Sequence, residues 1–115
     1  GPPLKGKAAL VEGLRSGVLR LATESDLNAW KRSYEQQARH GVPREFDQRI
    51  GFGATIYVIT GDYTIPDDLT GSASATFILE RGAPYPNGEA SHSTILDISS
   101  GACVGWTCRS LSGED

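Results

Sequence analysis

The chain has 115 residues, of which 38% are hydrophobic and 22% charged, and its formal net charge is −3. This length suits one domain with its own core, and the composition excludes an extensively disordered chain. The negative charge argues against nucleic-acid binding driven by bulk charge, and the longest mostly apolar stretch, residues 54–59, is far too short to span a bilayer.

The charge is divided unevenly along the chain. Residues 1–50 carry nine Lys or Arg against six Asp or Glu, whereas residues 51–115 carry two Lys or Arg against eight acids. The first part is therefore basic (+3) and the second part acidic (−6). The hydrophobic pattern changes at the same boundary, so we expect helices in the first part and strands in the second.

The ends of the chain are interpreted separately from its core. Residues 1–3 read as a tag scar or leader, which leaves a single α+β domain over residues 4–111 and a frayed tail over 112–115. We expect a soluble domain, either cytoplasmic or secreted after removal of a leader. An accessory domain of a larger protein is an alternative interpretation of the same sequence.

The first predicted element is a helix, because apolar side chains recur at helical spacing over residues 8–21. Gly13 and Gly17 weaken this prediction by roughly 1 kcal/mol each. A shorter helix over 7–15, followed by a strand at 18–23, is the competing interpretation. The pattern leaves residues 18–23 open.

The second predicted helix is the clearest element of the chain. Ser25 is its expected N-cap, with Asp26 in the first turn, and Gly41 and Pro43 are expected to end it. One apolar stripe runs along this helix and predicts the face that packs on the sheet; its members are Leu27, Trp30, Tyr34 and Ala38.

Strands are predicted beyond Gly51, where apolar side chains alternate or form short runs rich in β-branched residues. They cover residues 52–60, 73–80, 92–98 and 102–108, with turn-rich connections between them. We interpret them as an antiparallel meander. The predicted fold class is therefore α+β, with N-terminal helices packed on a roughly four-stranded antiparallel sheet. Whether strand 52–60 is central or lies at an edge stays open.

Cys103 and Cys108 both fall in the last predicted strand. In a regular strand their Cα atoms would lie about 16 Å apart, whereas a disulfide needs about 4.4–6.8 Å. We therefore favour two free thiols. A bond between them would require a turn, which Gly105 could supply.

One group of residues could support catalysis, because its members fall at the ends of adjacent predicted strands: Glu80, Arg81, His92 and Arg109. A carboxylate, a histidine and arginines suffice for metal-free RNA cleavage. Either the carboxylate or the histidine takes the proton of the 2′-hydroxyl, the other donates a proton to the leaving oxygen, and arginine stabilises the phosphorane charge. In layout, helices followed by a four-stranded antiparallel sheet resemble small microbial ribonucleases and related toxin domains. A ribonuclease-like effector or toxin domain is therefore the alternative function.

The leading hypothesis is a protein-interaction module that binds a partner through the acidic sheet-and-loop half. The candidate partner-binding residues are charged or aromatic side chains on loops: Asp67, Asp68, Tyr85 and Glu89. The expected partner is a protein with a basic patch, and RNA is a substrate only under the alternative. No cofactor, metal or membrane is expected to bind, because no motif for any of them occurs.

Overall fold

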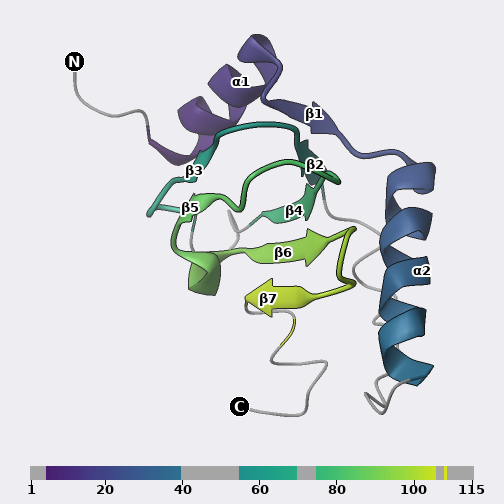
Figure 1. Ribbon diagram of the computed structural model, residues 1–115. Helices are drawn as coiled ribbons and strands as arrows, with labels where there is room; N and C mark the ends of the chain where they lie inside the picture. The colour runs from purple at the N-terminus through teal and green to yellow at the C-terminus, as the bar shows by residue number, and fades with distance from the viewer. Residues whose placement is uncertain (1–4, 40–54, 70–74, 106–107, 109–115) are drawn as a thin grey trace.

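The computed structural model describes residues 5–39, 55–69, 75–105 and 108 (Figure 1). Its helices are α1 (Gly6–Ser16) and α2 (Glu24–Arg39). The main sheet contains β1 (Leu19–Leu21), β2 (Ile56–Ile59), β4 (Thr76–Leu79), β6 (Thr94–Asp97) and β7 (Cys103–Gly105). A separate ribbon contains β3 (Thr64–Ile65) and β5 (Asn87–Gly88), and the 3₁₀ turn η3 covers Ala90–His92.

The sheet has the strand order β1-β2-β4-β6-β7 and is mixed. Its three inner strands, β2, β4 and β6, run parallel, and β1 and β7 pair antiparallel at the two edges. The α+β class is confirmed, but the predicted antiparallel meander is wrong. The sequence left open whether the strand before Thr60 is central or lies at an edge. It is an inner strand, because β2 lies between β1 and β4.

The connections explain the parallel order. Parallel neighbours need a crossover of about a dozen residues or more, and residues 60–75 and 80–93 are long enough to provide one. The sequence pattern predicts only turn-rich connections within these segments, at residues 62–71 and 82–88. The inner strands are also nearly continuous apolar runs, which is typical of parallel strands buried on both faces.

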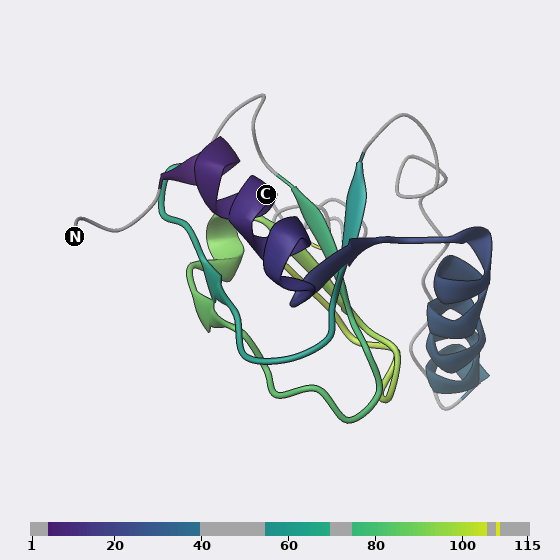
Figure 2. The same ribbon diagram turned by 90° about the horizontal axis from the view of Figure 1, so that it is seen from above.

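The sheet separates two hydrophobic clusters, and Figure 2 shows the helices on its opposite sides. Helix α2 covers one face, where the buried residues are Leu27, Trp30, Tyr34, Ile56, Val58, Ile78, Leu96 and Ile98. Helix α1 and the β3–β5 ribbon cover the other face, where the buried residues are Leu19, Ile59, Ile65, Leu69, Ala75, Phe77, Leu79 and Ile95. The predicted packing of the Trp30 and Tyr34 stripe on the sheet is confirmed.

The competing interpretation of the first helix is correct: a short helix is followed by a strand. Gly17 ends α1 with φ +88°, a left-handed conformation suited to glycine, and its N–H donates to the carbonyl of Gly13. The chain then turns directly into β1. Gly13 itself faces Leu19, so the absence of a side chain lets the helix approach the sheet closely.

The N-cap of α2 differs from the prediction, because Thr23 and not Ser25 precedes the helix. The Thr23 hydroxyl accepts a hydrogen bond from the Asp26 N–H at 3.3 Å, and the Asp26 carboxylate accepts one from the Thr23 N–H at 2.8 Å. This is a reciprocal cap of the capping-box type, with Asp in place of Glu. The predicted stop signals, Gly41 and Pro43, lie outside the described residues.

The two cysteines form a disulfide, with their Cα atoms 5.5 Å apart, so the prediction of free thiols is wrong. The regular strand assumed for residues 103–108 is not formed. Strand β7 ends at Gly105, whose φ of +116° and close contact with the Ser93 carbonyl leave no room for a side chain. The left-handed backbone of Gly105 thus lies within the segment that the disulfide closes.

Candidate functional site

A groove opens between the start of α1 and strand β3. It has a volume of about 580 Å³, and its lining residues come from two distant parts of the chain: Lys5, Ala9, Thr64, Ile65, Pro66, Asp67 and Asp68. Figure 1 shows β3 and β5 beside α1, on the side of the sheet away from α2. Two of the predicted partner-binding residues, Asp67 and Asp68, therefore line one cavity.

The parallel β3–β5 pairing brings a third predicted residue to the same end of the ribbon. Ile65 pairs with Gly88, so the chain leaves both strands in the same direction. Asp67 and Asp68 follow β3 and Glu89 follows β5, and all three side chains are exposed. Carboxylates that were separated in the sequence thus gather beside the groove.

Asp68 has a structural task in addition to its charge. Its Oδ1 accepts a hydrogen bond from the Gly6 N–H at 2.6 Å, across 62 residues of sequence. A carboxylate at a helix N-terminus satisfies a free backbone donor and interacts favourably with the helix dipole. Asp67 makes no such contact with a described residue, so its carboxylate is free to meet a ligand.

The groove is acidic overall. Lys5 contributes a positive charge to its lining, against Asp67 and Asp68, with Glu89 nearby. Side chains with exposed charges interact over about 10 Å at ordinary ionic strength. The site is therefore complementary to a positively charged ligand, and its affinity for one should fall as salt is added.

Tyr85, the fourth predicted partner-binding residue, lies away from these acids. The Asn87 N–H donates to the Tyr63 carbonyl, which places the preceding loop at the opposite end of the ribbon from Glu89. Tyr85 is 53% exposed, and partial burial, followed by the nearby Asp97 charge, raises the pKa of its hydroxyl. The structure therefore divides the predicted binding surface into an acidic groove and a separate aromatic loop.

Two members of the predicted catalytic group, Glu80 and His92, are not brought together. Thr76 pairs with Thr94 in the parallel ladder, so His92 lies at the amino ends of β4 and β6 while Glu80 follows the carboxyl end of β4. At about 3.3 Å per strand residue, Glu80 lies on the order of 13 Å beyond that pair, on the side away from His92. The ribonuclease hypothesis depended on their adjacency and loses that support.

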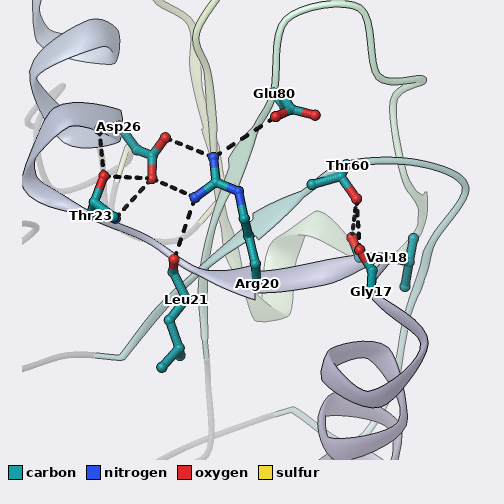
Figure 3. A network of polar contacts seen from close by, with 8 residues as sticks. All are labelled: Gly17, Val18, Arg20, Leu21, Thr23, Asp26, Thr60 and Glu80. Atoms are coloured by element: carbon teal, nitrogen blue, oxygen red, sulfur yellow. Dashed lines mark hydrogen bonds and ion pairs between the residues drawn. The ribbon is translucent and has the colours of Figure 1, made fainter.

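Glu80 instead faces Arg20, at a distance of 3.8 Å between the carboxylate and the guanidinium (Figure 3). Arg81 is exposed in the turn that follows, and Arg109 lies outside the described residues. His92, the histidine within the described residues, is thus too far from Glu80 to exchange a proton with it.

Figure 3 shows the polar network to which Glu80 belongs. Arg20 donates two hydrogen bonds to Asp26, at 2.8 and 2.9 Å, and this joins β1 to the start of α2. The hydrogen bonds from Arg20, together with those from Thr23, hold the pKa of Asp26 well below its ordinary value. The same pairing raises the pKa of Arg20. Both ions are stabilised as charges, which indicates a structural tie and not a proton-transfer site.

No known protein family, curated protein or solved structure matches this chain. In the part of the chain that the structure describes, no three His, Cys, Asp or Glu side chains come together as they would around a metal ion. No helix in that part has the length and hydrophobicity needed to cross a membrane. The acidic groove is thus the site with the clearest chemical character among these residues.

Proposed function

We propose that this chain is a small α+β interaction module that binds a basic segment of a partner protein in the groove between α1 and β3. The observation that carries the proposal is the gathering of Asp67, Asp68 and Glu89 at one end of the β3–β5 ribbon, beside a cavity. Exposed charges of one sign around a groove attract a ligand of the opposite sign and set its orientation.

The arrangement of the groove also suits a peptide more than a small anion or a nucleic acid. Its walls are a helix and a short strand, and apolar groups of Ala9, Ile65 and Pro66 lie beside the acids. A peptide can place its backbone and apolar side chains on such walls while a Lys or Arg side chain reaches the carboxylates. A phosphate backbone would be repelled by the same carboxylates.

The test is a selection of twelve-residue peptides from a random phage-displayed library on the purified protein. We expect the selected peptides to be rich in Lys and Arg. Asp67→Lys should weaken the binding of a synthetic copy at least tenfold, because it reverses the charge that is free to meet the ligand. Glu35→Lys is the matched control, because Glu35 is also exposed but lies on α2, beyond the opposite face of the sheet.

The salt dependence gives a second readout. The affinity of the wild-type protein for the selected peptide should fall between 50 and 300 mM NaCl, and the dependence should be weaker for Asp67→Lys. Selected peptides without basic residues, or equal binding by both charge-reversal variants, would overturn the proposal.

A further inference from the structure

Within the part of the chain that the structure describes, strand β3 pairs with β5 along one edge and with no other strand. The Asn87 N–H donates to the Tyr63 carbonyl at 3.0 Å, and the parallel register of Thr64 with Asn87 and of Ile65 with Gly88 places the next ladder bonds on Ile65. In a strand, successive residues direct their backbone groups to alternate sides, so Thr64 directs its N–H and C=O away from β5.

The other edge of β3 is available to a ligand at the groove. Thr64 is exposed and lines the cavity together with Ile65 and Pro66. Among the described residues, no backbone or side-chain group forms a hydrogen bond with the N–H or C=O of Thr64. Pro66 has no N–H, so the edge offers a donor and an acceptor at Thr64 and no donor at Pro66.

A strand edge with an unused donor and acceptor is a template for another extended chain. We infer that the partner segment binds as an added β-strand along the free edge of β3, with one of its residues paired to Thr64 and a Lys or Arg side chain beside Asp67. This inference rests on the proposed function, because it specifies how the basic segment lies in the same groove. The backbone pairing fixes the conformation of the segment, and the charge selects its sequence.

The geometry limits the number of backbone bonds. A strand laid on Thr64 donates one of its own N–H groups to the Thr64 carbonyl and accepts one bond from the Thr64 N–H. The amides on either side of that donor point away from β3. The peptide amide that donates to Thr64 should therefore matter for binding, and its two neighbours should not.

The experiment uses the full chain and a synthetic dodecapeptide obtained from the library selection. Each backbone amide of the peptide is N-methylated in turn, and its Kd is measured by fluorescence anisotropy. We expect one N-methylated position to raise the Kd at least tenfold, while its two neighbours change it less than threefold. In parallel, hydrogen exchange of the Thr64 amide, measured by NMR, should slow at least tenfold when the peptide saturates the protein.

The outcomes separate the inference from the proposal on which it rests. If no single N-methylation weakens binding and Thr64 stays unprotected, while Asp67→Lys still weakens binding, the segment is held by charge alone and the strand inference is overturned. If Asp67→Lys has no effect, the proposed function itself fails. If sedimentation shows that the chain self-associates at the concentrations used and that Asp67→Lys prevents this, a second copy occupies the groove and the partner-segment inference is also overturned.

Discussion

The two faces of the sheet are closed in different ways. On the α2 face, Trp30 is fully buried, and its indole N–H donates to the Ala102 carbonyl at 3.0 Å. The Ser33 hydroxyl donates to the Ile98 carbonyl at 2.5 Å, and Gly101 lies directly against the backbone of α2. Helix α2 is thus fixed by apolar packing and by hydrogen bonds to the turn between β6 and β7.

On the α1 face, the cover is shorter and looser. Helix α1 leaves Val11 and Leu14 exposed, at 47% and 38%. Its first turn meets the β3 loop through the Gly6–Asp68 hydrogen bond, and the groove lies at this junction. The ribbon beside it consists of two-residue strands.

The difference separates stability from binding. On the α2 face, the described residues are held by dense packing and hydrogen bonds, whereas the short elements of the α1 face leave a groove with charged groups at its rim. Regions with few buried contacts open locally at low free energy, and binding sites are commonly drawn from them. Variants on the two faces test this division.

Truncating the centre of the α2 face should cost the most. Trp30→Ala removes a fully buried aromatic side chain and the hydrogen bond to Ala102, and we expect a loss of about 3–5 kcal/mol in the free energy of unfolding. Urea denaturation followed by circular dichroism measures it. Val11→Ala, on the exposed side of α1, is the control and should change stability by less than about 1 kcal/mol. Similar losses for both would contradict the division between the faces.

A glycine pair tests how closely the β6–β7 turn approaches α2. Gly101 has φ +74°, and a Cβ there would lie 2.5 Å from the backbone of Ser33, whereas Gly17 has φ +88° with open space around it. Gly101→Ala should destabilise by about 2–4 kcal/mol, because backbone strain and a clash add. Gly17→Ala should cost about 1–2 kcal/mol from strain alone. Equal midpoints in thermal unfolding would show that the turn can move away from α2.

The α2 face was also the more predictable from sequence. The stripe containing Trp30 and Tyr34 is a local pattern with helical period, and local periodicity survives in the fold. Gly101 falls in the connection between the predicted strands 92–98 and 102–108, and the sequence gives no sign of its contact with Ser33, because the two residues are far apart in the chain. Such close approaches depend on tertiary packing and leave no local pattern.

The predicted antiparallel strand order was wrong for a related reason. The apolar pattern located β2, β4 and β6, but it does not say which strands become neighbours or in which direction they run. Assuming hairpins placed Glu80 and His92 together, and the parallel ladder separates them.

Asp67, Asp68 and Glu89 are candidates because of their charge, yet their groove requires α1 to meet β3, and two-residue strands are too short to show periodicity.

The polar tie between β1 and α2 predicts a pH dependence. Hydrogen bonds from Arg20 lower the pKa of Asp26 below its ordinary value of 3.8, so the ionised carboxylate stabilises the fold above that pH. This contribution is lost as the pH falls through the lower, folded pKa. Asp26→Asn should therefore cost about 1–2 kcal/mol at pH 7 and progressively less below about pH 4.

Urea denaturation at a series of pH values between 2 and 7 measures the dependence. Glu35→Gln is the control, since Glu35 is exposed on the same helix. A destabilisation by Asp26→Asn that stayed constant down to pH 2 would show that the ion pair with Arg20 does not contribute.

The smallest expected effect distinguishes the two aspartates of the groove. Asp68→Ala removes the acceptor of the Gly6 N–H and should destabilise the protein by about 1 kcal/mol, with faster hydrogen exchange in the first turn of α1. Asp67→Ala removes the neighbouring charge but no hydrogen bond to a described residue, so it should leave stability within about 0.5 kcal/mol of wild type. Both variants should weaken the binding of a basic peptide, because both remove a negative charge beside the groove. Only Asp68→Ala should also loosen α1.

Equal effects of the two variants on hydrogen exchange would mean that α1 is held mainly by its packing on the sheet. The α1 face would then be closed more like the α2 face than the groove suggests.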